Sequence, residues 1–384
     1  MSGNLWGSQS WLQPAFSRQK EPPERRLQAR LPAPLGGQLV RELDLSGHVV
    51  MPGLINAHDH LEFNLFPRLG RGPYRNAGEW ARDIYHPERS PIREQLRVPK
   101  AVRLWWGGLK NLLSGVTTVC HHNPYEREVF NADFPVRVVR RFAWAHSLEF
   151  EPDLAARFRK APASYPFVIH CAEGVDANAR REVHALDDAG ALDGRTAIVH
   201  GVGIKGDGLD LMRRRCAALV WCPTSNLAML GRTVSRAVLR SGIPMALATD
   251  SALSAGVDLL DELALARKYL PPARLYEMVT SAPARILRLA PQPRDWIALR
   301  TDARTRAAAL FEGTVALVVV AGRIRLISPD LARQLPPSER PRFQLLHVEN
   351  RPPVLVRADV RRLRRAAAKH LGQDLRLAGK RILS

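Results

Sequence analysis

Two histidines, His58 and His60, stand two residues apart at the end of an apolar run that begins at Gly53. In a β-strand, side chains at positions i and i+2 point to the same face of the sheet. Two neutral imidazoles on one face provide two nitrogen ligands for a transition metal. The spacing therefore predicts half of a metal site at the end of this strand.

Other polar residues stand in the same position relative to apolar runs. His170, His200 and Asp250 each follow a short strand-like run. A single buried histidine is most often a hydrogen-bonded core residue, but here the pattern recurs at four separate runs. The carboxyl ends of parallel strands meet at one face of a β/α barrel, where its active site is built. Three imidazoles and a carboxylate suit Zn²⁺, with Fe²⁺, Mn²⁺ and Co²⁺ as alternatives.

The elements that would position these residues alternate between strand-like and helical patterns, which favours a parallel α/β fold. The strand-like runs are 53–57, 116–120, 136–145, 166–169, 197–199, 217–221 and 245–248. The helical patterns between them are 98–113, 177–189, 209–215, 234–240 and 259–269. Further β-rich segments near both ends of the chain indicate a small sheet built from the two ends.

The segments that carry these residues resemble the amidohydrolase superfamily, in particular its one-metal deaminase and chlorohydrolase branch, which includes cytosine- and guanine-deaminase-like enzymes. The matching segments are 50–60, 115–119, 170–173, 199–201, 222–226, 249–251 and 258–262. The resemblance implies an α/β fold, namely a distorted TIM-like (β/α)8 barrel with a small composite β-sandwich from the N- and C-terminal segments. We find seven barrel-like strands in the sequence, where this fold has eight.

The resemblance also implies a role for each strand-end residue. It implies that His58, His60, His170 and Asp250 bind one metal ion, and that Glu173, His200 and Asp250 are catalytic. Glu173 follows His170 by three residues, so its carboxyl can move protons near the metal without binding it. The structural alternative for Glu173 is a carboxylate at the positive start of the following helix.

Four further residues are candidates for substrate binding. His121 and His122 end the second strand-like run, where they contact substrate, supply an additional metal ligand, or make strand-end hydrogen bonds. Glu62 continues the alternation after His60, and Trp144 could form an aromatic wall for a flat ring or pack in the core. The pattern leaves these alternatives open.

Composition narrows the class of protein. The chain has 384 residues, 46% hydrophobic and 24% charged, which excludes a disordered or fibrous protein. Its formal charge of +20 invites a nucleic-acid interpretation, but no aromatic stacking platform accompanies the basic tail. No apolar run is long enough to span a bilayer. The four cysteines form no C-x-x-C pair, so we expect a reducing cytoplasmic location.

These observations divide the chain into four parts. The expected divisions are a flexible arm at 1–35, a composite β-sandwich from 36–52 and 291–330, a metal-dependent hydrolase barrel at 53–290, and a basic helical extension at 331–384.

The function expected from the site is hydrolysis of a carbon–nitrogen bond, first of all hydrolytic deamination of an aminated heterocycle by metal-activated water. Hydrolysis of an amide or cyclic amide on the same scaffold is the alternative, because activated water serves both reactions. An alternative of another class is a nucleic-acid-associated protein that acts through the basic tail. We expect a small-molecule substrate and no membrane partner; nucleic acid is the less favoured partner, and the sequence leaves a homo-oligomer open.

Overall fold

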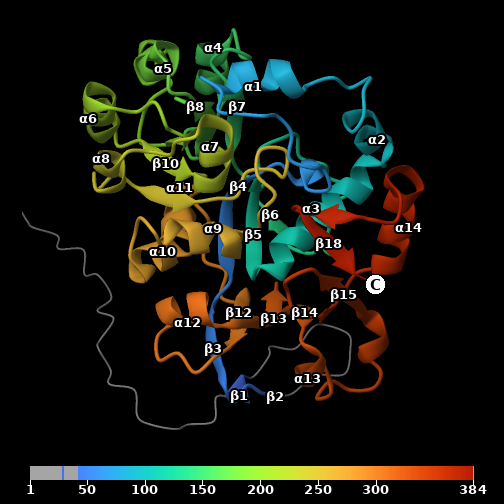
Figure 1. The fold of residues 1–384 in the computed structure, drawn as a ribbon. Helices are drawn as coiled ribbons and strands as arrows, with labels where there is room; N and C mark the ends of the chain where they lie inside the picture. The colour runs from blue at the N-terminus through green and yellow to red at the C-terminus, as the bar shows by residue number, and fades with distance from the viewer. Residues whose placement is uncertain (1–27, 30–41, 384) are drawn as a thin grey trace, which may run out of the picture.

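A computed structural model describes residues 28–29 and 42–383 of the chain (Figure 1). The expected flexible arm, 1–35, lies outside the described residues except for β1 (Gln28–Ala29), which pairs with β2 (Leu43–Asp44) in an antiparallel ladder. Among the described residues, no helix combines the length and apolar character needed to cross a membrane.

Parallel strands form the centre of the molecule, as the alternation of strand-like and helical patterns predicted. One sheet has the order β4-β5-β6 and the other the order β11-β10-β9-β8-β7. Their bounds are β4 Leu54–Asp59, β5 Val116–His121, β6 Arg137–Val138, β7 Ala143–Ser147, β8 Phe167–Cys171, β9 Thr196–His200, β10 Ala218–Trp221 and β11 Met245–Leu247. Every residue of β8, β9 and β10 is buried, which is typical of parallel strands covered on both faces.

The expected single strand at 136–145 is divided, and this changes how the sheet closes. Its first part, β6, pairs with β5, and its second part, β7, pairs with β8, without a helix between them. The parallel strands β4 to β11 therefore lie in two sheets, and no ladder closes them into a barrel in the described part of the chain. The two halves of this segment pair with different strands, because between Val139 and Phe142 the chain leaves the ladder with β5 and enters the ladder with β8.

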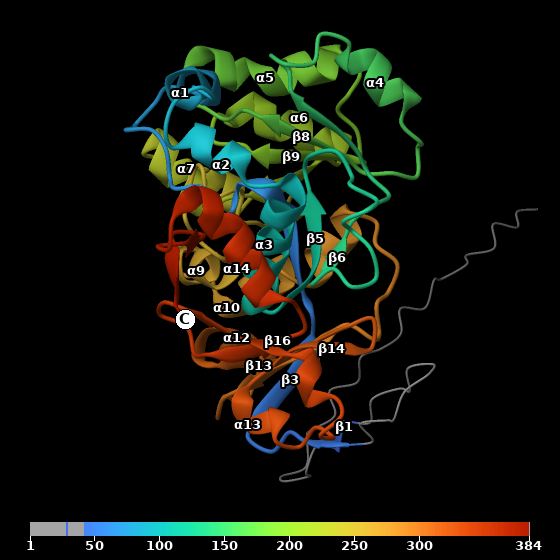
Figure 2. The ribbon, with the colours of Figure 1, turned by 90° about the vertical axis from the view of Figure 1, so that its right-hand side faces the viewer.

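Helices connect the parallel strands and lie outside them (Figures 1 and 2). Their bounds are η1 Leu61–Phe63, α1 Ala77–Ile84, α2 Ile92–Arg97, α3 Lys100–Leu113, α4 Leu154–Lys160, α5 Ala177–Asp188, α6 Gly206–Arg215, α7 Pro223–Leu230, α8 Arg236–Leu239, α9 Leu259–Ala266, α10 Pro272–Met278 and α11 Ser281–Ile286. Side-chain caps start several of them: Asp176 accepts from the Ala179 amide at α5, and Asp258 and Asp261 form a capping box at α9.

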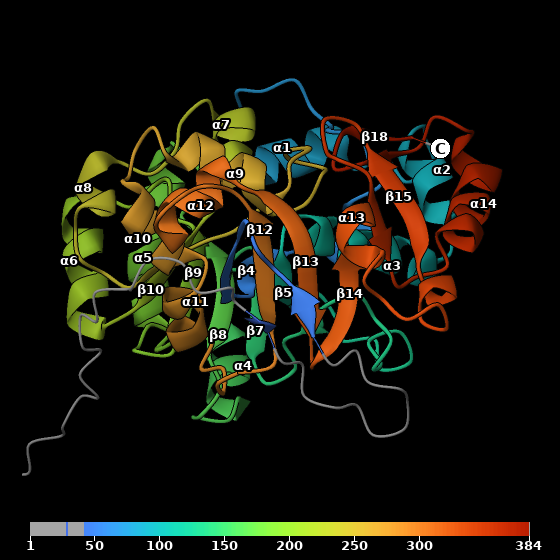
Figure 3. The same ribbon diagram turned by 90° about the horizontal axis from the view of Figure 1, so that it is seen from below.

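An eight-stranded antiparallel sheet lies beneath the parallel strands and joins segments from near both ends of the described chain (Figures 1 and 3). Its order is β17-β18-β15-β16-β14-β13-β12-β3. The bounds are β3 His48–Pro52, β12 Trp296–Arg300, β13 Thr314–Val320, β14 Arg323–Ile327, β15 Gln344–Val348, β16 Val354–Val356, β17 Arg376–Leu377 and β18 Lys380–Leu383. Helices α12 Arg306–Glu312, α13 Pro329–Ala332 and η2 Arg340–Arg342 lie between these strands in sequence.

The C-terminal extension, 331–384, differs from the expected helical segment. It contains one long helix, α14 (Val360–Leu371), but also β15 to β18, which extend the antiparallel sheet. Val360, Leu363 and Ala367 are buried on one side of α14, which packs against α2 and α3 (Figure 2). These short strands were not predicted, because basic residues dominate the composition of this segment. The amphipathic pattern of α14, in contrast, was visible in the sequence.

Candidate metal centre

The three histidines predicted as metal ligands converge at the carboxyl ends of β4 and β8. His170 Nε2 lies 3.2 Å from His58 Nε2 and 3.4 Å from His60 Nε2. Two nitrogen atoms at bonding distances of about 2.0–2.1 Å from a tetrahedral zinc ion lie about 3.4 Å from each other. The spacing of these ring nitrogens therefore fits a common metal ion.

Asp250, which follows β11, faces two of these imidazoles and groups with His58 and His200 as potential metal ligands. Its Oδ1 lies 3.5 Å from His58 Nε2 and 3.7 Å from His60 Nε2. Its Oδ2 accepts hydrogen bonds from Ser225 Oγ at 2.8 Å and Ser254 Oγ at 2.6 Å. One carboxylate oxygen is thus held by hydroxyls while the other faces the imidazoles. Burial alone would raise the pKa of Asp250, but the His58 hydrogen bond and the nearby imidazoles hold it well below its usual value, so the group is ionised.

Hydrogen bonds on the far side of two imidazoles fix which ring nitrogen is free. His170 Nδ1 lies 2.8 Å from the backbone oxygen of His146, and a carbonyl can only accept, so Nδ1 carries the proton and Nε2 presents a lone pair. His60 Nδ1 makes the same kind of contact with Asn123 Oδ1 at 3.1 Å. Burial lowers the pKa of His58 to about 4 and that of His170 well below its usual value. Neutral imidazoles with free Nε2 atoms are what a transition metal requires.

Glu173 and His200 form a pair beside this cluster. His200 Nε2 lies 3.3 Å from Glu173 Oε1, and His200 Nδ1 lies 2.9 Å from Asn226 Oδ1. Burial raises the pKa of Glu173 well above its usual value, and the nearby carboxylates of Asp250 and Glu182 add to this effect. The raised pKa favours the protonated carboxyl, whose proton could pass to His200 Nε2 or to a bound molecule.

Backbone strain gathers at the same strand ends. Ala172, His200 and Asp250 have φ angles of +56°, +73° and +56°, in the left-handed region that such residues rarely adopt. Ala172 lies between His170 and Glu173, so the strain occurs at three of the strand ends that supply the cluster. Strained residues persist where the surrounding structure holds them, and they concentrate at functional sites.

The candidate substrate-binding residues lie at different places around the centre. His122 joins the imidazole cluster: it lies with His58, His60 and His170 in one group whose ligand atoms are within 4.8 Å of one another. Its Nε2 is 3.0 Å from the Ala145 carbonyl oxygen, while its Nδ1 is buried without a partner.

Trp144 lies next to His122, and the centroids of their rings are 5.3 Å apart. The Arg157 guanidinium lies 5.0 Å from the centroid of the Trp144 ring. His121 and Glu62 lie behind His60 instead. Glu62 accepts a hydrogen bond from Asn123 Nδ2 at 2.7 Å, and the His121 Nε2 lies 3.5 Å from its other oxygen. Their contacts with a substrate stay predictions.

Sequence analysis did not predict the buried polar residues that lie next to the candidate metal ligands. Lys110, on α3, is only 1% exposed, and Ser254 holds the Asp250 carboxylate. A signal for Lys110 was present: it follows Trp106 by four residues, on a helix face that is otherwise mostly apolar. A lysine on such a face needs a buried partner, but the sequence could not identify that partner.

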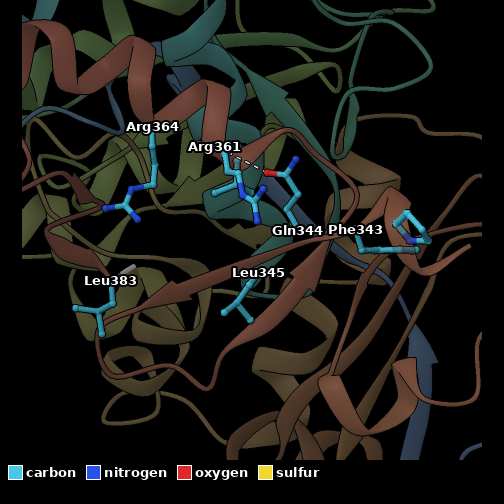
Figure 4. Close-up of a pocket in the computed structure, with 8 residues that line it drawn as sticks. Phe343, Gln344, Leu345, Arg361, Arg364 and Leu383 are labelled. Atoms are coloured by element: carbon cyan, nitrogen blue, oxygen red, sulfur yellow. Dashed lines mark hydrogen bonds between the residues drawn. The ribbon is translucent and has the colours of Figure 1, made fainter.

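A separate cavity of about 430 Å³ lies between α14 and β15 (Figure 4). Phe343, Leu345 and Leu383 line it together with Arg361 and Arg364. None of the candidate metal or catalytic residues lines this cavity, so it is distinct from the imidazole cluster.

Comparison with known proteins shows similarity to the amidohydrolase family. The amidohydrolase family model matches residues 163–292. A 5-methylthioadenosine/S-adenosylhomocysteine deaminase of Pyrococcus furiosus is 25% identical, covering 64% of this chain and 72% of the relative. A second deaminase of this name, from Archaeoglobus fulgidus, is 23% identical and covers 71% of this chain and 73% of the relative.

Solved structures show the same fold. A triazine hydrolase variant superposes with a TM-score of 0.62 at 17% identity, covering 85% of this chain and 88% of that one. A mutant atrazine chlorohydrolase of Arthrobacter aurescens, complexed with zinc and atraton, gives 0.62 at 17% identity and covers 85% and 89%. An adenosine deaminase of Xanthomonas campestris with bound zinc gives 0.53 at 18% identity and covers 73% and 81%.

Proposed function

Starting from its confirmed similarity to the amidohydrolase superfamily, we propose that this protein is a metal-dependent hydrolase of carbon–nitrogen bonds, and specifically a hydrolytic deaminase of an aminated heterocycle. The observation that carries the proposal is the close approach of His170 Nε2 and Asp250 Oδ1 to the Nε2 atoms of His58 and His60, with the Glu173 carboxyl beside His200.

The ligands of the metal would be His58, His60, His170 and Asp250. A zinc ion held there would lower the pKa of water and polarise an unsaturated carbon–nitrogen bond. Ser225 and Ser254 orient the Asp250 carboxylate, and the His146 carbonyl orients His170, so the protein fixes the donor atoms before any metal binds. His122 has a buried, unpartnered Nδ1 near the same atoms, which favours a role toward substrate or as an additional ligand.

Glu173 would move the protons of the reaction. In hydrolytic deamination a carbon–oxygen bond forms to water, a carbon–nitrogen bond breaks, and the amino group leaves as ammonia. Glu173 can donate its proton to a ring nitrogen, take a proton from the attacking water, and pass one to the leaving amino group. His200, held at Nδ1 by Asn226, keeps the carboxyl in place through its Nε2.

The substrate class rests on what the similar proteins are named for. They include deaminases of methylthioadenosine, S-adenosylhomocysteine and adenosine, and hydrolases of triazines. All of these substrates present a flat, nitrogen-rich ring. Trp144 and His122 offer aromatic faces beside the imidazole cluster, and we propose that these two residues contact such a ring.

The finer architecture belongs to the same proposal. We propose that β4 to β11 form a distorted TIM-like barrel, with 53–290 as the hydrolase unit and with 36–52 and 291–330 forming the composite β-sandwich, of which 36–41 lie outside the described residues. The solved structures of similar fold support the barrel. All four cysteines are free thiols, which supports a cytoplasmic location.

Release of ammonia tests the proposal directly. Purified protein loaded with Zn²⁺ would be incubated with a panel of aminated purines, pyrimidines and triazines and, separately, with amides and lactams. The proposal expects ammonia from at least one aminated ring, released about 10²–10⁴-fold more slowly from the same ring by Glu173→Gln. Turnover of lactams alone would favour the amide hydrolase instead, and turnover by Glu173→Gln at the wild-type rate would refute the assigned role.

A further inference from the structure

The metal centre joins residues from strands that share no ladder in the described part of the chain. His58 lies in the first parallel strand, β4, and His60 directly follows it, whereas Asp250 follows the last, β11. Hydrogen bonds cross between them at three points: the Asp250 amide donates to the His58 carbonyl at 3.2 Å, the Thr249 amide donates to Asn56 Oδ1 at 3.2 Å, and Asn56 Nδ2 donates to Thr249 Oγ1 at 2.9 Å. An interaction that reaches both strand ends at once would add to these bonds in fixing their separation.

Lys110 supplies such an interaction from α3. Its Nζ lies 2.9 Å from Asp59 Oδ2, 2.9 Å from Thr249 Oγ1 and 3.0 Å from Asn64 Oδ1. These three acceptors use all three donors of the ammonium group. Asp59 stands between the two histidines of β4, with its side chain on the opposite face, and Thr249 directly precedes Asp250. One buried charge thus contacts the neighbours of three candidate ligands.

The acceptors around Lys110 are themselves satisfied. Asp59 Oδ1 accepts from Asn64 Nδ2 at 2.8 Å, and Asp59 Oδ2 accepts from Asn111 Nδ2 at 2.7 Å. Asn56 Nδ2 donates to Asn111 Oδ1 and to Thr249 Oγ1, each at 2.9 Å. All six side chains are buried, and each of their polar atoms has a partner. A buried ion pair is well ordered only when such a network is complete, so the geometry of each member constrains the others.

We propose that Lys110, paired with Asp59, is a positioning residue of the metal centre. It sets the separation between the β4 histidines and Asp250 by holding Asp59 and Thr249 at once. The inference rests on the proposed metal site. A buried pair that only stabilises the fold would leave metal affinity and coordination geometry unchanged when altered, so these two quantities distinguish the roles.

The test uses apo-protein loaded with Co²⁺, whose visible absorption spectrum reports the coordination geometry. The variants are Lys110→Met, which removes the charge at similar length, and Thr249→Val, which removes only the hydroxyl. Lys380→Met is the matched control, because Lys380 forms another largely buried pair, 2.8 Å from Asp258 Oδ2, away from the imidazole cluster. Metal affinity would be measured by competition with a chelator, and thermal unfolding of each apo-protein by circular dichroism.

Lys110→Met is expected to bind Co²⁺ about 10–100-fold more weakly and to change the visible spectrum, as loss of outer contacts to a metal site does. Thr249→Val should shift both in the same direction by less, and Lys380→Met should lower the unfolding temperature while keeping affinity and spectrum. If Thr249→Val keeps the wild-type spectrum and affinity, and folded Lys110→Met does so as well, the inference is overturned but the proposed function is not. Wild-type protein that binds no Co²⁺ would overturn the proposed function as well.

Discussion

Glu173 is the residue whose replacement separates proton transfer from metal binding. Its carboxyl contacts His200 Nε2 at 3.3 Å and is not among the residues that converge on the Nε2 cluster. Glu173→Gln is therefore expected to keep the metal but to lower kcat by about 10²–10⁴-fold, the usual contribution of a positioned acid or base. Ammonia release and metal analysis of the same preparation provide the measurement. Loss of the metal in this variant would contradict the assignment.

Part of the site could be predicted from sequence because it depends on local geometry. The i, i+2 spacing of His58 and His60 on a strand, and the strand-end places of His170 and Asp250, required only the periodicity of a β-strand. Lys110 was not predictable in the same way. Its partner, Asp59, is 51 positions away on another element, and only the packing of α3 against β4 brings them together.

At the scale of elements, the turn between β8 and α5 positions Glu173 and depends on a second carboxyl. Glu182, on α5, accepts a hydrogen bond from the Ala172 amide at 2.6 Å, at the residue whose φ is +56°. Burial raises the pKa of Glu182 to about 7, although the Ala172 amide counteracts this in part. This carboxyl therefore links the strained turn to the helix that follows it.

The raised pKa of Glu182 gives a pH dependence with a defined sign. The unfolded chain loses this proton near the ordinary pKa of glutamate, but the folded chain keeps it to about pH 7. Between these values the folded state binds more protons, so the free energy of unfolding falls as pH rises and then levels off. Glu182→Gln, which keeps an acceptor for the amide, should gain stability relative to wild type by up to about 3 kcal/mol over this range.

Urea unfolding of wild-type protein and Glu182→Gln at pH 5, 6, 7 and 8 would measure this difference. The two stability curves are expected to diverge toward pH 7 and to run in parallel above it. Curves that stay parallel from pH 5 upward would show that the Glu182 carboxyl titrates as it does in the unfolded chain.

Element prediction succeeded where apolar periodicity is strong and failed where pairing is set at long range. The strand-like run at 166–169 overlaps β8, and the run at 197–199 lies within β9. The division of 136–145 into β6 and β7 was not visible, because both halves are equally strand-like and only their different partners separate them. The C-terminal strands were missed because basic residues dominate this segment and because β15 pairs with β18 across the intervening α14.

At the scale of the whole molecule, the basic C-terminal segment is part of the folded body. Lys380 pairs with Asp258, the Ala378 amide donates to the Asn64 carbonyl at 2.9 Å, and Leu363 and Leu377 are buried. Loss of one buried leucine typically costs about 2–5 kcal/mol. Deletion of 357–384 is therefore expected to abolish cooperative thermal unfolding.

Replacing only exposed arginines of α14 tests the role of the positive charge while keeping the buried residues of the C-terminal segment. Arg361, Arg362 and Arg365 are exposed on α14, so their combined replacement by Glu should leave the unfolding temperature within a few degrees of wild type. Retention of DNA or RNA by wild-type protein, lost in this variant at two salt concentrations, would support the nucleic-acid alternative. A stable, cooperatively folding deletion protein would contradict the packing argument.

The measurement that tests the central claim most directly is X-ray absorption spectroscopy of the purified protein with Zn²⁺, combined with metal analysis. The account predicts about one equivalent of tightly bound metal with three imidazole nitrogens and one carboxylate oxygen at about 2.0–2.2 Å, and loss of that metal in both His58→Ala and Asp250→Ala. A zinc shell with fewer than three imidazoles, or unchanged metal content in these two variants, would contradict it.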